Sequence, residues 1–198
     1  MNLVRHTLSK IKDSRENVSH AFCMTVAENR PAESGTYISR KSPMNIIVIG
    51  IGQSLRGDDA AGLEAVRLWQ EKYPQTAQTV RVELAELPGL VLLDLLKGMD
   101  AAILVDAVHA SAPAGTLVRL GLDDLAAFTP GTGSAHGWGV AETLHLGRSL
   151  HPWLTDMRVT LIGIVGEQFA IGAGLSSRVR AALAETEERI EVEVRSLL

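Results

Sequence analysis

The sequence predicts an α/β fold, a three-layer sandwich in which a twisted, mostly parallel sheet has helices on both faces. Two observations lead to this prediction. From residue 45 onward, short apolar runs alternate with stretches whose apolar residues recur at helical spacing. The runs at residues 45–51, 101–108 and 158–166 are apolar almost throughout, which is typical of strands buried on both faces of a parallel sheet.

The first four elements follow from periodicity and from residues that end helices. Residues 45–51 form a continuous apolar strand. Residues 59–73 carry apolar side chains at helical spacing up to Pro74, which ends the helix. Residues 79–87 alternate between apolar and polar, as in a strand with one covered face. Residues 89–98 are strongly apolar and end at a glycine, as in a short helix.

The remaining elements continue the same alternation. Residues 101–108 form a second continuous apolar strand, and residues 115–122 alternate again after a turn that contains Pro and Gly. A polar loop then leads to a helix at residues 138–150. Residues 158–166 form a third buried strand, and residues 175–198 form a long terminal helix.

Composition limits the class of protein. The chain has 198 residues, 46% of them hydrophobic, which suits one globular domain with a substantial core. No apolar run approaches the ~18 residues that span a bilayer, so we expect no membrane insertion. The net charge of −4 gives no reason to expect a nucleic-acid partner. The single cysteine, Cys23, excludes an internal disulfide framework, and a reducing cytoplasm is the simplest compartment.

Residues 1–43 differ from the rest of the chain. They are polar, lack any sustained period, and hold seven Lys/Arg against four Asp/Glu, which leaves a balance of −7 on residues 44–198. No apolar segment precedes a cleavage site, so they do not form a secretory signal. Two interpretations stay open: a disordered N-terminal extension, or a misplaced start with Met44 as the true first residue. Residues 44–198 are expected to form a single α/β domain.

Polar residues at the ends of the predicted strands are the candidates for function, because open parallel sheets bind ligands beyond the carboxyl ends of their strands. Asp58 and Asp59 follow the first strand in "GQSLRGDDAAG", Asp106 ends the strand "AAILVDAV", and His136 lies in the loop "GTGSAHGWG". Two carboxylates and an imidazole make a suitable mixed oxygen and nitrogen site for a metal ion.

Each of these residues also has a purely structural interpretation. Asp58 suits the N-cap of the following helix, which is the role we expect for it, and Asp59 suits the first helical turn. Asp106 could accept hydrogen bonds from loop backbone where its strand ends, since a lone carboxylate there is costly unless paired. An isolated histidine such as His136 is more often structural than catalytic. The wide separation of the three makes the pattern nonspecific by itself.

Other chemistries fit the sequence less well. Gly52 and Gly57 have the spacing of a phosphate-binding loop, but Asp58 stands where the lysine belongs and would repel a phosphate. The nucleophile motif G-x-S-x-G is absent from the sequence. Cys23 lies in the polar N-terminal segment, which argues against a cysteine nucleophile. A nucleotide-binding domain is therefore disfavoured.

The segments "GIGQSLRGDDAAGLEAV", "LVDAVHASAPAGTL" and "SAHGWGVAETL", in this order and spacing, resemble the hydrogenase maturation proteases. The resemblance covers residues 45 to about 183. It implies a hydrolase, an endopeptidase that removes the C-terminal extension from the large-subunit precursor of a nickel–iron hydrogenase after nickel insertion. It also implies the sandwich fold described above and a monomer.

Carried over residue by residue, the functional trio of the family falls on Asp59, Asp106 and His136. The resemblance implies that these residues act in catalysis and bind nickel, and that this nickel belongs to the precursor. It leaves open whether metal-bound water or an aspartate acting as general base starts the cleavage; Asp58 is a spare carboxylate for the second account. The alternative from another class is a non-catalytic, nickel-responsive binding module or chaperone. One departure is Gln53, where the family usually has Asn.

Overall fold

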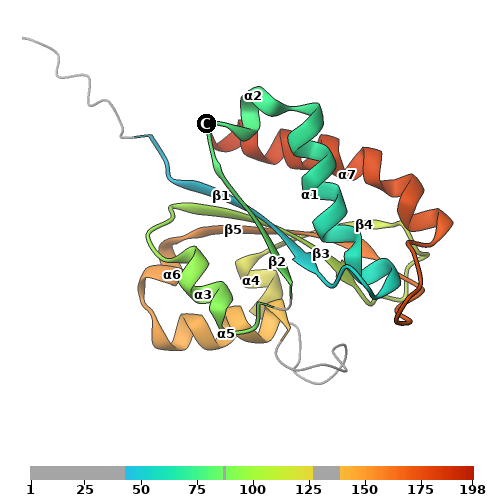
Figure 1. Ribbon diagram of the computed structural model, residues 1–198. Coiled ribbons are helices and arrows are strands. Elements are labelled where there is room, and N and C mark those ends of the chain that lie inside the picture. The colour runs from blue at the N-terminus through green and yellow to red at the C-terminus, as the bar shows by residue number, and fades with distance from the viewer. Residues whose placement is uncertain (1–42, 87, 127–138) are drawn as a thin grey trace, which may run out of the picture. The chain divides into compact units, whose positions relative to one another are not determined.

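The structure, a computed structural model, describes residues 43–86, 88–126 and 139–198. The chain divides into two units, residues 1–40 and 41–198, and all described residues lie in the second. Their sheet has the strand order β2-β1-β3-β5-β4 (Figure 1). All neighbours pair in parallel except β4, which is antiparallel to β5. The strands are β1 (Ile46–Gly52), β2 (Arg81–Glu86), β3 (Ala101–Val108), β4 (Leu117–Gly121) and β5 (Arg158–Val165).

Helices cover both faces of this sheet, so the predicted three-layer α/β fold is confirmed (Figure 1). One face carries α1 (Ala61–Lys72), α2 (Pro74–Ala77) and α7 (Ser177–Leu197). The opposite face carries α3 (Val91–Leu96), α4 (Leu122–Ala126), α5 (Val140–Leu150) and α6 (Trp153–Asp156). A 3₁₀ turn, η1 (Gly57–Ala60), leads into α1. No helix in the described ranges has both the length and the apolar character needed to cross a membrane.

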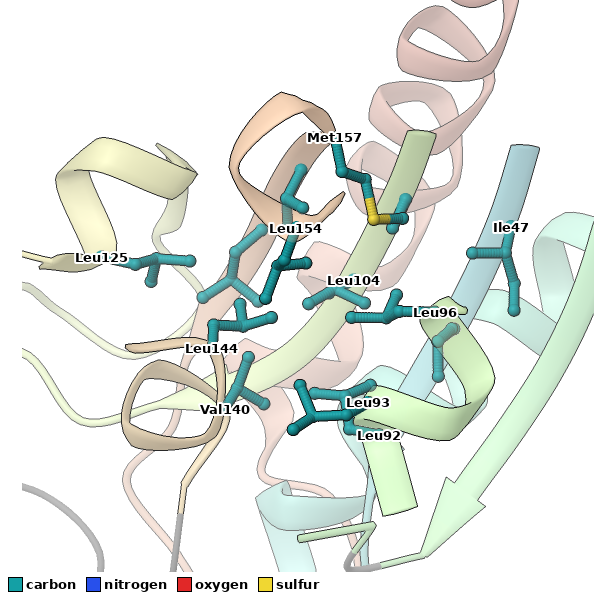
Figure 2. Packing of buried hydrophobic residues seen from close by; sticks show 14 of the residues in the cluster. Ile47, Leu92, Leu93, Leu96, Leu104, Leu125, Val140, Leu144, Leu154 and Met157 are labelled. Atoms are coloured by element: carbon teal, nitrogen blue, oxygen red, sulfur yellow. The ribbon is translucent and has the colours of Figure 1, made fainter. Parts of the chain in front are cut away.

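The central strands β1, β3 and β5 are largely buried on both sides, as their apolar sequences predict, whereas the edge strand β2 is not. Alternate residues of a strand point to opposite faces. In β1, Val48 therefore packs under α1 and α7, whereas Ile47 packs under α3 and α6. Figure 2 shows the core on the face covered by α3 and α6, where Leu104 of β3 lies among the side chains of Leu96 from α3 and Leu154 from α6. Each such buried side chain contributes roughly 1.5–3 kcal/mol to folding.

The expected elements agree with the structure, with two kinds of difference. The predicted helix at residues 59–73 is divided, because its first turn is η1 and α1 begins only at Ala61. The short helices α2, α4 and α6 were not expected, since four or five residues are too few to give a helical period. Of the segment predicted as an N-terminal extension, residues 1–43, only Pro43 is among the described residues.

Candidate functional site

Close approach of backbone to backbone brings the start of α1 onto the carboxyl ends of β1 and β3. Gly52 has φ +151°, and a Cβ there would lie 1.8 Å from the carbonyl oxygen of Asp59. A Cβ on Gly62 would lie 2.2 Å from the carbonyl oxygen of Val105. Gly52, one of the two glycines that resemble a phosphate-binding loop, thus serves a different purpose. Together with Gly62, it lets the turn that carries Asp59 fold directly against β1 and β3, the strand that contains Asp106.

Asp59 and Asp106 therefore lie at the same edge of the sheet. Asp106 is half-buried in β3, opposite Gly163 of β5, and Asp59 is half-buried in η1. Desolvation is the main cause that raises the pKa of Asp106 to about 7. The charge of Asp59 raises it further, while a hydrogen bond from the backbone N–H of Ala107 acts against both. The two carboxylates are close enough for their charges to repel.

Asp58 has a different role from the predicted one. Its side chain caps neither η1 nor α1, so the expected N-cap is wrong. The residue is fully buried, and its carboxylate accepts hydrogen bonds from the backbone N–H groups of Glu167, Gln168 and Ser176 at 2.9, 3.0 and 2.6 Å. These donors lie in the segment between β5 and α7. Asp58 thus joins that segment to the turn carrying Asp59, which argues against its use as a general base.

The same edge of the sheet holds further polar groups, and the sequence analysis did not single out two of them, Ser54 and Glu86. Ser54 donates a hydrogen bond to Glu86, the last residue of β2. The rule that strand ends carry function, applied to the strand expected at residues 79–87, would have found Glu86 as well. Gln53 is half-buried, and its Oε1 atom has no hydrogen-bond partner in the part of the chain that the structure describes.

The third predicted ligand, His136, lies outside the described residues. Within residues 43–86, 88–126 and 139–198, no three His, Cys, Asp or Glu side chains are grouped to hold a metal ion. His109 follows β3 and packs its ring on Phe169, with the ring centroids 4.2 Å apart. The structure accordingly brings together the two carboxylates of the predicted trio.

A groove on the described part of the chain lies elsewhere. It has a volume of about 670 Å³ and is found where β1, β3 and β5 begin, at the amino ends of these strands. Parallel strands direct their carboxyl ends to the opposite edge, so this groove is separate from Asp59 and Asp106. Its walls include Met44, Met99, Trp153 and Met157.

Comparisons with known proteins identify the family of the chain. A family model described as hydrogenase maturation protease matches residues 70–193. The hydrogenase 2 maturation protease of Escherichia coli is 26% identical over 148 residues, which cover 74% of this chain and 88% of the relative. The chain is also similar in structure to the NiFe hydrogenase maturation protease HybD from Thermococcus kodakarensis, with a TM-score of 0.60 and 26% identity. That match covers 76% of this chain and 99% of the other.

A second solved structure supports the fold. The hydrogenase maturating endopeptidase HybD from E. coli superposes with a TM-score of 0.64 at 24% identity, over 77% of this chain and 93% of that one. At this identity the likeness concerns the fold, including the mostly parallel sheet between helices.

Proposed function

Because this chain belongs to the hydrogenase maturation protease family, we propose that it removes the C-terminal extension from the large-subunit precursor of a nickel–iron hydrogenase once nickel has been inserted. The chain is an enzyme, a peptidase. The substrate in this proposal is a folded protein, and the nickel belongs to that substrate. Hydrolysis adds one water across a single peptide bond and releases the extension as a peptide.

The observation that carries the proposal is the pairing of Asp59 with Asp106. Burial is the main cause that raises the pKa of Asp106 to about 7, and the charge of Asp59 adds to it. The fold thus holds two carboxylates close together although their negative charges repel. A bound dication removes this cost. Carboxylate oxygens are acceptable ligands for Ni²⁺, and imidazole is a good one. We assign His136 as the third ligand from the resemblance of its loop to that of the family.

Recognition of nickel in this way makes cleavage conditional. If Asp59, Asp106 and His136 bind the metal of the precursor, only a loaded precursor is held with its C-terminal segment against the carboxyl edge. The water that attacks the peptide bond would be activated either by the nickel of the precursor or by an aspartate acting as general base. Of the acidic residues after β1, Asp59 suits the second role better than Asp58, because three backbone N–H groups occupy the Asp58 carboxylate.

A cleavage assay tests the function. The full chain is incubated with nickel-loaded large-subunit precursor from the same organism, and the mass of the subunit is measured over time. We expect loss of the extension, and a rate that falls roughly 10²–10⁴-fold in Asp59→Asn and Asp106→Asn. A variant of either residue that cleaves at the wild-type rate would contradict the site. Stable binding without cleavage would favour the alternative, a nickel-responsive binding module.

A further inference from the structure

An uncharged and largely exposed stretch of chain lies beside the turn that carries Asp59. Residues 169–174 read Phe-Ala-Ile-Gly-Ala-Gly and contain no charged or hydrogen-bonding side chain. Ile171 is 81% exposed, and Leu55, four residues before Asp59, is 73% exposed. Isolated apolar side chains are common on protein surfaces. The case for a binding surface therefore depends on whether Leu55 and residues 169–171 are contiguous.

Backbone hydrogen bonds make them contiguous. The N–H of Gly172, which follows Ile171, donates to the carbonyl oxygen of Leu55 at 2.8 Å. Two residues after Leu55, the N–H of Gly57 donates to the carbonyl oxygen of Ala173 at 3.1 Å. Figure 1 shows the turn after β1 beside the segment that enters α7, at the end of the sheet. We name the surface formed by Leu55, Phe169, Ala170 and Ile171 the apolar edge.

The apolar edge is held in place from behind. The buried carboxylate of Asp58 binds the N–H groups of Glu167, Gln168 and Ser176, so it fixes the segment at both of its ends. Gly57, at φ +57°, brings the two backbones so close that a Cβ there would lie 2.3 Å from the carbonyl oxygen of Gln168. A surface that is already ordered loses little conformational entropy on binding.

The surroundings of the apolar edge favour an apolar ligand. Glu167, at the start of the segment, is ion-paired with Arg178 at 3.1 Å, so the two exposed side chains together add no net charge beside the apolar edge. Phe169 packs on His109, the residue that follows β3. The apolar edge therefore extends from the turn that carries Asp59 to the residue after β3, the strand that contains Asp106.

We propose that the apolar edge binds an apolar segment of the hydrogenase large-subunit precursor next to the bond that is cut. This inference rests on the proposed function. Leu55 and Asp59 belong to one turn, which is closed by hydrogen bonds from Gln53 N–H to Asp59 C=O and from Asp59 N–H to Arg56 C=O, so Leu55 is within reach of a polypeptide bound at Asp59. The apolar edge thus contributes affinity for the protein substrate, separately from the nickel ligands.

Substitution at these exposed positions gives a clean test, since neither side chain contributes to the core. Leu55→Ser, Ile171→Ser and the double variant are compared with Val192→Ser, which removes a 60% exposed apolar side chain from α7. For loaded precursor, we expect the double variant to raise KM about fivefold or more while kcat and Tm stay unchanged. Val192→Ser should leave all three quantities at their wild-type values.

The opposite results overturn the inference. An unchanged KM in the double variant contradicts it, as does an equal rise in Val192→Ser. A concentration-dependent dimer of the wild-type chain that Leu55→Ser dissociates assigns the surface to a second copy instead. If the wild-type chain binds precursor without cleaving it, the proposed function fails. The docking surface is then tested by binding alone: an equal Kd for precursor in wild type and double variant contradicts it, and a weaker Kd in the double variant supports it.

Discussion

The Oδ1 atom of Asp58 accepts a hydrogen bond of 2.6 Å from the backbone N–H of Ser176, which is 118 residues further along the chain. The hydroxyl of Ser176 in turn accepts a hydrogen bond from the N–H of Val179 and caps α7. One buried carboxylate therefore links the turn that carries Asp59 to the beginning of the terminal helix. The stability of the site and the stability of the fold are coupled at this point.

Replacing Asp58 by Asn tests this link. The amide group would place N–H donors against backbone N–H donors, and we expect the free energy of unfolding to fall by about 2–4 kcal/mol. Denaturant unfolding measures the change. Ser176→Ala is the control: it removes the cap of α7 and the hydroxyl that also hydrogen-bonds Asp58, but retains the three backbone N–H donors, and it should cost only about 1 kcal/mol. Equal losses in the two variants would contradict a special role for Asp58.

The pH dependence of stability gives a second prediction for Asp58. Burial raises the pKa of its carboxyl, but the N–H donors of Glu167, Ser176 and Gln168 outweigh burial and hold the pKa below its ordinary value. A lowered folded-state pKa means that the stabilisation is complete above the unfolded value near pH 4 and is lost as the pH falls through the folded value. The stability difference between wild type and Asp58→Asn should be constant from pH 5 to 7 and shrink below about pH 4.

Asp106 should show the opposite sign. Its folded-state pKa is raised to about 7, so the folded protein binds a proton that the unfolded chain releases near pH 4. Stability should therefore fall as the pH rises from about 4 to about 7 in the metal-free protein. Asp106→Asn removes this effect, and we expect it to be more stable than wild type by about 1–3 kcal/mol at pH 8, with little difference at pH 4. Thermal unfolding of wild type and Asp106→Asn is measured across this pH range, with Asp94→Asn, a substitution of an exposed carboxylate, as the control. If the stability of wild type and Asp106→Asn depends on pH in the same way, the assignment to Asp106 is wrong.

A buried carboxylate remote from the site gives a contrasting prediction. Glu191 of α7 accepts hydrogen bonds from Trp69 Nε1, Thr76 Oγ1 and Arg195 Nε at 3.0, 2.8 and 2.6 Å. Glu191→Ala leaves buried donors unpaired and should cost about 2–4 kcal/mol of stability. Because Trp69 lies about 12 Å along α1 from its first residue, kcat for precursor cleavage should not change at temperatures where the variant is folded. Unfolding followed by tryptophan fluorescence measures the loss of stability, and the rate of precursor cleavage measures kcat.

The sequence predicts the sheet well because its signal is local. Buried parallel strands such as residues 101–108 are recognisable from their own composition, and the structure gives β3 the same bounds. The short helices α4 and α6 leave no such signal. The role of Asp58 could not be predicted either, because its partners are backbone N–H groups more than 100 residues away, and nothing in their side chains identifies them.

The candidate site was predictable to the extent that topology determines it. Asp59 follows β1 and Asp106 lies near the end of β3, and neighbouring parallel strands end at a common edge of the sheet. Their close approach depends further on Gly52 and Gly62. The sequence pattern around Gly52 by itself equally suggests a phosphate-binding loop. The assignment of His136 remains a prediction from family resemblance.

The central claim is that cleavage depends on nickel in the substrate, and one measurement tests it most directly. The full chain is mixed with equal amounts of nickel-loaded and nickel-free large-subunit precursor, and the mass of each subunit is followed over time. The account predicts that only the loaded precursor loses its C-terminal extension. Equal rates of cleavage for the two precursors would contradict nickel recognition by Asp59, Asp106 and His136.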